Sequence, residues 1–378
     1  MNVYAAGLLV SITVYLVVGA YAGRKVRHLE DYFVAGRQAP TLLIVGTLVA
    51  SLMSTNAFMG ETGMAYAGNP GLLILLTAIN GIGYVAGALF FGRFLRRSRA
   101  LTVAEYFGRR FDSRRVQSVA GITVVLGCTA YLVMVTQGTA TIIHEVTGLS
   151  FSVTLLVTWL GYTLFTLYSG SRGVVLTDTM MFLLFSAVAF MGLAVVLGEA
   201  GGWLAAIREL SVFVEKPEIL AWHGRVGPES NWSTPLDALI WSVILGVAWS
   251  IVVAVSPWQA SRYLMARDEH TVLRSAVVTA GVVLFLYLVL MLCGAAINLL
   301  NPDIEPAQEN MIWAALNVMP VPIGVLMMSG IMAAGLSSAS TFLSLSGFSI
   351  SNDILGPRAL SRNNPLRSSR LAMLGIGL

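Results

Sequence analysis

Ala50-Ser-Leu-Met-Ser-Thr-Asn56 interrupts an otherwise apolar run that covers residues 40–66. Four of its seven side chains are polar, and Gly60 and Gly63 follow closely. A helix that unwinds inside a membrane leaves backbone carbonyls without helical partners, and these are tolerated only where they line a cavity or bind an ion. The stretch therefore predicts a discontinuous membrane helix. Ordinary close packing of helices, in which Gly and Ser are common, is the alternative.

The composition around this stretch is that of a membrane protein. Hydrophobic residues make up 56% of the chain and charged residues 11%, whereas soluble domains carry about 25% charged residues. The isoelectric point of about 9.2 does not indicate a nucleic-acid partner, because the basic residues lie between apolar spans. The two cysteines, Cys128 and Cys293, each lie inside an apolar segment, which supports neither a disulfide framework nor a metal site.

Apolar runs long enough to cross about 30 Å of hydrocarbon occur nine times. They cover residues 3–23, 40–66, 71–95, 116–146, 151–170, 174–198, 236–256, 274–300 and 321–352. A tenth run begins near Leu371. We expect residues 1–378 to form a single transmembrane domain of nine complete spans and the start of a tenth. On this interpretation the C-terminal helices are missing and the chain is a piece of a longer protein.

The basic residues predict the orientation of these spans. With the N-terminus outside, 20 of the 23 Lys and Arg residues lie in cytoplasmic connections, as the positive-inside rule requires. We therefore predict a multi-pass protein of the cell (inner) membrane with its N-terminus outside. One cytoplasmic connection contains Thr102-Val-Ala-Glu105, whose capping-box spacing predicts a short helix.

The seventh span has its own candidate interruptions at Gly246, at Trp249-Ser250 and at Ser256-Pro257. Two interrupted spans separated by four others are the pattern of a five-plus-five inverted repeat. Transporters with such repeats bind ions and solutes at discontinuous helices near the middle of the bilayer.

Polar groups elsewhere in the spans suggest a cation site. In Met332-Ala-Ala-Gly-Leu-Ser-Ser-Ala-Ser-Thr341, the hydroxyls of Ser337, Ser338 and Thr341 share about one third of the helix circumference. They either bind a small cation or bond back to their own backbone. Asp178 lies within the sixth span and binds a cation, carries a proton or pairs with Arg172. Glu61 is expected at a solvated helix end, with an outer vestibule as the alternative.

The order and spacing of several motifs resemble the sodium:solute symporter family. These motifs are Asp31-Tyr-Phe-Val-Ala-Gly-Arg37, Phe58-Met-Gly60 with Tyr66, Leu101-Thr-Val-Ala-Glu-Tyr-Phe107, Thr177-Asp178 and Asn352-Asp-Ile354. The resemblance implies an all-α integral membrane protein. It also implies a leucine-transporter-type five-plus-five inverted-repeat core, preceded by one extra helix and truncated within the second repeat.

The resemblance also implies ion sites. The family's sodium site corresponds to the backbone carbonyls of Ala50, Met53 and Ala334 with the hydroxyls of Ser337 and Ser338. Some relatives have a second sodium site, which corresponds to Asp178, Ser340 and Thr341. Na⁺ is therefore the expected coupling ion, in one or two copies.

The expected solute is a small polar molecule such as an amino acid, a carboxylate or a similar metabolite. Ala57 stands where sugar-transporting relatives have a glutamine, which weakens a sugar reading. The groups best placed to contact the solute are Ser54, Thr55, Asn80, Tyr131, Gln137 and Trp249.

The sequence thus predicts a sodium-coupled symporter that imports its solute by alternating access. Two rivals stay open: a transporter-like sensory module of a signalling protein, and a proton-coupled carrier that uses Asp178. An enzyme is not expected, because no His, Cys or carboxylate cluster occurs within the spans. The predicted partners are the solute, sodium ions and the lipid bilayer, and the oligomeric state is left open.

Overall fold

The computed structural model describes residues 2–228, 230–356 and 365–377. These residues form helices, and their β structure is a single bridge between Ala39 and Ala266. The long elements are α1 (Val3–Gly23), α3 (Thr41–Leu52) with η2 (Ala57–Glu61) and α4 (Thr62–Tyr66), α5 (Pro70–Gly87) with η3 (Ala88–Gly92) and α6 (Arg93–Ser98), α8 (Arg114–Thr147), α9 (Phe151–Glu199), α11 (Pro235–Val255) with α12 (Pro257–Met265), α13 (Glu269–Ile297), and α15 (Val321–Phe348) with η5 (Ser349–Leu355). The short elements are α2 (Leu29–Val34), η1 (Ala35–Arg37), α7 (Val103–Arg110), α10 (Trp203–Ser211), η4 (Ala307–Glu309), α14 (Asn310–Asn317) and α16 (Pro365–Gly377).

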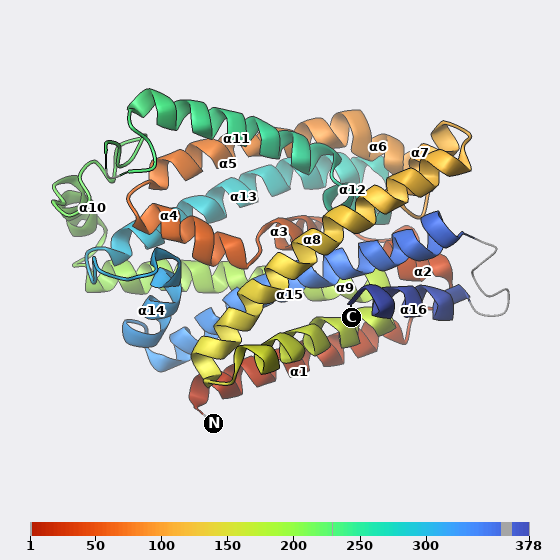
Figure 1. Cartoon of the computed structure of the whole chain (residues 1–378), viewed down its shortest axis with the longest axis horizontal. Helices are drawn as coiled ribbons and strands as arrows, with labels where there is room; N and C mark the ends of the chain where they lie inside the picture. Colours follow the sequence, from red (N-terminus) through yellow and green to blue (C-terminus); the bar gives the residue numbers. More distant parts are fainter. Residues whose placement is uncertain (1, 229, 357–364, 378) are drawn as a thin grey trace.

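Seven of the described helices are long and apolar enough to cross a membrane, and the bent pair α3 and α4 makes an eighth. The fifth and sixth predicted spans both lie within α9, whose 49 residues correspond to about 74 Å at about 1.5 Å per residue. This length exceeds one hydrocarbon core. At Gly170 the backbone leaves helical geometry, with φ 55° and ψ −150°, and the chain doubles back there (Figure 1). The described residues therefore accommodate the nine predicted spans.

Both predicted interruptions are present. Between α3 and α4 the helix axis bends by 63°, and Met53 has extended geometry with ψ 92°. In the seventh span the break falls at Ser256, with ψ 143°, because a proline follows and disfavours helical geometry at the preceding residue. The other candidates, Gly246 and Trp249-Ser250, stay helical. Gly246 instead lets α11 approach α5, since a Cβ there would lie 3.0 Å from the side chain of Ile79.

The segments that connect the spans lie at two opposite ends of the helix bundle (Figure 1). The N-terminus, α10 and α14 lie toward one end, and α2, α6 and α7 lie toward the other. The predicted short helix is α7, and the Thr102 hydroxyl accepts a hydrogen bond of 3.0 Å from the Glu105 amide. The Glu105 carboxylate in turn accepts a 2.8 Å hydrogen bond from the Leu101 amide, which closes the start of the helix.

The centre of the bundle is α15, which packs against α1, α3, α8 and α9. Its side chains are buried almost continuously from Met327 to Phe348. The small residues of the 332–341 stretch allow this close contact, because a Cβ on Gly335 would collide with the side chains of Thr139 and Thr55. The hydroxyl-rich stretch therefore lies against the break between α3 and η2.

Candidate functional site

The end of α3 and the middle of α15 meet through a cluster of oxygen atoms. The Ser337 hydroxyl donates to the Ala50 carbonyl at 2.9 Å and lies 2.9 Å from the Ala334 carbonyl. The Ser338 hydroxyl lies 3.4 Å from the same Ala50 carbonyl. All four residues are fully buried. The structure thus brings together four of the five residues that the sequence assigned to a first sodium site.

The fifth, Met53, is fully buried at the end of α3. Its amide donates to the Val49 carbonyl at 2.9 Å, and its extended backbone then turns the chain away from the helix. The site fits a small hard cation for two reasons. Its assigned donors are all oxygen atoms, and the C-terminal end of a helix carries partial negative charge. Transporters built from inverted repeats coordinate sodium at unwound carbonyls and at the C-terminal ends of half-helices.

The residues of the proposed second sodium site surround an arginine. The Asp178 carboxylate accepts a 2.5 Å hydrogen bond from the Thr47 hydroxyl and lies 3.4 Å from Arg262 Nη2. The same guanidinium nitrogen contacts the Thr341 hydroxyl. Ser340 instead donates to the Ser337 carbonyl of its own helix, at 2.9 Å. A tethered positive charge therefore lies among the oxygen atoms predicted to bind a second ion.

This arrangement corrects two interpretations of the sequence. Arg172, the predicted ionic partner of Asp178, pairs with Asp31 at 3.1 Å. Arg262 is one of the 20 basic residues that the sequence assigns to cytoplasmic connections, but it lies in α12 with 1% of its surface exposed. Its burial follows from the break at Ser256, after which α12 packs beneath α3 and α15. An unpaired charge is costly in such a place, and the Asp178 carboxylate supplies the pairing.

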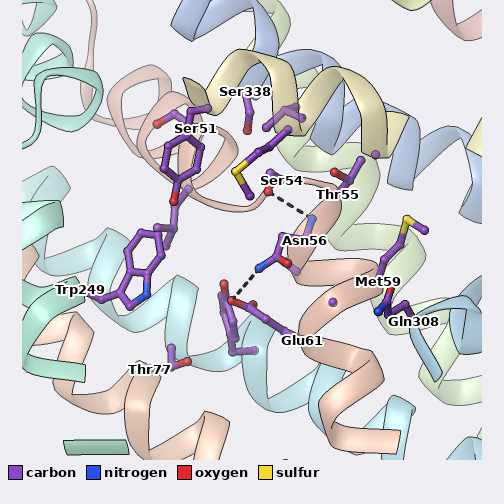
Figure 2. A pocket seen from close by; sticks show the side chains of 18 of the residues that line it. Ser51, Ser54, Thr55, Asn56, Met59, Glu61, Thr77, Trp249, Gln308 and Ser338 are labelled. Carbon is purple, nitrogen blue, oxygen red and sulfur yellow. Dashed lines mark hydrogen bonds between the residues drawn. The ribbon is translucent and has the colours of Figure 1, made fainter. Parts of the chain in front are cut away.

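A cavity of about 520 Å³ opens beside the break. Its walls come from residues 51–61 with α5, α8, α11, α12, α13, η4 and α15. Figure 2 shows Asn56 between Ser54 and Glu61, with Trp249 on the opposite wall. The Asn56 backbone N–H donates to the Ser54 hydroxyl at 3.2 Å, and the Asn56 side-chain Nδ2 donates to Glu61 Oε1 at 3.3 Å.

Five of the six predicted solute residues line this cavity, namely Ser54, Thr55, Asn80, Tyr131 and Trp249. Gln137 does not line it and is exposed. The cavity-facing residues of α8 include Met134, Gly138 and Thr141, which follow helical spacing. Gln137 precedes Gly138 by one residue and therefore points about 100° away from it around the helix.

Glu61 was predicted at a solvated helix end, but it lines the cavity within the π-helical segment η2. Its Oε2 atom is buried without a hydrogen-bond partner among the described residues, and the Tyr287 hydroxyl lies near the carboxylate. A second carboxylate, that of Glu309 in η4, also lines the cavity. Burial, with Glu145 nearby, raises the pKa of Glu309.

Another wall is aromatic, and two of its three side chains, Trp258 and Phe342, were not among the solute residues predicted from the sequence. Tyr131, Trp258 and Phe342 surround one another, with ring centroids 5.1 to 5.7 Å apart. They come from α8, α12 and α15 and all three line the cavity. Their spacing along the chain carries no signal of this contact. The rings meet because the break at Ser256 turns Trp258 toward the centre.

Comparisons with known proteins agree on one family. The model of the sodium:solute symporter family matches residues 32–364. The sodium/pantothenate symporter of Escherichia coli K12 is 24% identical over 97% of this chain and 76% of its own length. The human sodium/iodide cotransporter is 27% identical over 100% of this chain, which spans 58% of that protein.

A solved structure of a Na⁺-coupled sialic acid symporter, in a substrate-bound outward-open state, shares the fold. The two structures superpose with a TM-score of 0.84 and share 21% sequence identity. The match covers 100% of this chain and 79% of the symporter chain. In the part of this chain that the structure describes, no three His, Cys, Asp or Glu residues gather as a metal-binding group. The oxygen cluster at the helix break and the match over residues 32–364 lead to one conclusion: the chain belongs to the sodium:solute symporter family.

Proposed function

We propose that this chain carries a small polar solute into the cell together with sodium, by alternating access. The observation that carries the proposal is the shared Ala50 carbonyl, which two hydroxyls from α15 approach at 2.9 and 3.4 Å. A sodium ion held by Ala50, Met53, Ala334, Ser337 and Ser338 would join α3 to α15. Because α3 and α15 belong to different repeats, the ion would favour one arrangement of the repeats over the other.

The solute would bind in the adjacent cavity. Ser51, Ser54 and Thr55 belong both to the cavity wall and to the segment around the break. An ion that orders this segment therefore also orders part of the solute site. Coupling then arises because each ligand pays less of the ordering cost when the other is bound.

We further propose that one sodium ion suffices. The Arg262 guanidinium lies against Asp178 and Thr341 and supplies the positive charge that a second ion would bring. The same pairing disfavours proton coupling through Asp178, since a neighbouring positive charge stabilises an ionised carboxylate. A second ion held by Asp178, Ser340 and Thr341 is the alternative, which the sodium dependence of binding tests.

The orientation completes the proposal. With the N-terminus outside the cell membrane, η4 and α14 face outward, and the cavity extends from the break toward Gln308 and Glu309 of the outer loop. The cavity would then receive solute from outside. The alternative of a transporter-like sensory module makes the same binding predictions but predicts no uptake.

The test is sodium-dependent stability and uptake of the full-length gene product. Purified protein in detergent should show a higher apparent Tm in NaCl than in KCl of equal concentration. At sodium concentrations about 100-fold above Kd, the expected stabilisation is about 2.7 kcal/mol. Equal stability in both salts would contradict the sodium site. Sodium stabilisation without uptake in proteoliposomes would favour the sensory role.

A further inference from the structure

The cavity beside the helix break has a strongly biased set of charged groups. Two carboxylates, those of Glu61 and Glu309, line it, and none of its described lining residues is Lys, Arg or His. The other polar residues in the lining carry hydroxyls, amides or, in Trp249 and Trp258, an indole N–H. A solute that carries a negative charge would therefore meet no cationic side chain there.

Two unsatisfied oxygen atoms line the same space. Glu61 Oε2 is buried without a hydrogen-bond partner in the described structure. Asn80 is 5% exposed, and its Oδ1 atom also has none. Buried polar atoms are rarely left unpaired unless a ligand or water completes them. Both atoms are hydrogen-bond acceptors, so they fit a ligand that brings donors.

The aromatic wall favours the same kind of ligand. The rings of Tyr131, Trp258 and Phe342 form a tilted cluster, and Trp249 and Tyr287 also line the cavity. Aromatic faces attract ammonium groups, and cages of such rings are a known way to bind alkylated ammonium ions. The cavity volume of about 520 Å³ suits a small organic molecule.

We propose that the solute is a small organic cation, whose ammonium group binds between the Glu61 carboxylate and the aromatic cluster of Tyr131, Trp258 and Phe342. This inference rests on the proposed function and specifies its solute. It replaces the carboxylate solutes that the sequence allowed. It also separates this chain from its relatives named for pantothenate and iodide, which are anions.

The experiment measures solute binding to the full-length protein by quenching of tryptophan fluorescence. Trp249 and Trp258 line the cavity, so a solute bound there changes their fluorescence. The probes are choline and ethanolamine as cations, pantothenate and acetate as anions, and myo-inositol as a neutral solute. All are titrated in saturating NaCl. We expect a saturable signal from at least one cation and none from the anions or myo-inositol. If neither cation binds, or if an anion binds as tightly, the proposal is overturned.

The matched variants are Glu61→Gln, which removes the charge at constant shape, and Glu209→Gln on the exposed face of α10. Glu61→Gln should weaken cation binding at least tenfold, while Glu209→Gln should leave it unchanged. Unchanged cation binding in Glu61→Gln overturns the proposal. If that variant does not fold, the charge selectivity of the wild type decides by itself.

Sodium stabilisation, measured in the same samples without solute, separates this proposal from the one on which it rests. Sodium stabilisation without cation binding refutes only the cationic solute. Absence of sodium stabilisation refutes the sodium-coupled function.

Discussion

Replacing Ser337 or Ser338 with alanine should weaken sodium binding without disturbing the fold. Each change removes one of the two hydroxyls near the Ala50 carbonyl and leaves the backbone unchanged. A hydrogen bond or ligand contact to a charged group contributes about 1.5–3 kcal/mol. Since about 1.4 kcal/mol corresponds to a factor of ten, loss of one ligand predicts a rise in the sodium Kd of about 10- to 150-fold.

Ser337→Ala and Ser338→Ala should raise the sodium Kd by different factors, because the two hydroxyls make different contacts in the ion-free structure. The Ser337 hydroxyl makes good hydrogen-bond geometry with the Ala50 and Ala334 carbonyls, at 2.9 Å each, so its removal also destabilises the ion-free state by about 1 kcal/mol. That loss offsets part of the effect and places Ser337→Ala near tenfold. The Ser338 contact is longer, at 3.4 Å, so the ion-free state loses less and Ser338→Ala should show an equal or larger shift.

The assay is the sodium concentration that gives half-maximal thermal stabilisation, repeated as half-maximal uptake in proteoliposomes. Ser344→Ala is the matched control, because Ser344 lies buried on the same helix and donates to the Thr341 carbonyl at 2.9 Å. It should bind sodium like the wild type. Unchanged sodium dependence in both Ser337→Ala and Ser338→Ala would refute the site.

Four further predictions address the rest of the structure. Arg262→Met and Asp178→Asn should each destabilise the protein by about 3–5 kcal/mol, because each leaves one buried charge unpaired. The double variant should regain much of the loss in apparent Tm. The sodium dependence of uptake by the wild type should have a Hill coefficient near one, and a value near two would contradict the single ion. Gly170→Ala should lower the yield of folded protein in size-exclusion chromatography, since φ 55° with ψ −150° is accessible almost only to glycine and the new Cβ would lie 2.6 Å from the Tyr32 carbonyl oxygen. Burial lowers the pKa of Lys216 from 10.5 to about 8. Between these pH values the unfolded chain binds more protons than the folded chain, so the stability of the folded chain rises with pH. The Tm of the wild type relative to that of Lys216→Met should therefore increase from pH 7.5 to pH 9.5, and a constant difference would show that Lys216 titrates normally.

Local features of the sequence predicted much of the membrane architecture. A span is recognised from its own hydropathy, and the break at Ser256 from the proline that follows it, because a proline restricts the residue before it wherever the helix is placed. The capping residues of α7 act over three to four positions and were likewise visible in advance. The oxygen cluster of Ala50, Ser337 and Ser338 was assigned through resemblance to a family. Local patterns could not predict it, because Ser337 and Ser338 lie 287 and 288 positions after Ala50 in the chain.

Other features depended on rotation and on long-range contact. Hydropathy does not report which way a helix is turned about its axis, so Gln137 was assigned to the cavity while its neighbour Gly138 lines it. Glu61 was predicted at a solvated helix end because the residues that share its cavity, Tyr287 of α13 and Gln308 and Glu309 of η4, come near it only in the folded chain.

The sequence by itself determined the spans, the break at residues 50–56, a choice of three positions for the break in the seventh span, and the residue types available for sodium. Only the tertiary structure decided the ionic partner of Asp178, because Arg262 lies 84 positions away and reaches it through the turn between α11 and α12. It also decided the character of the solute cavity, since Tyr131, Trp258 and Phe342 come from three separate helices. Charge pairing and cavity shape are properties of distances in space, which local sequence patterns do not encode.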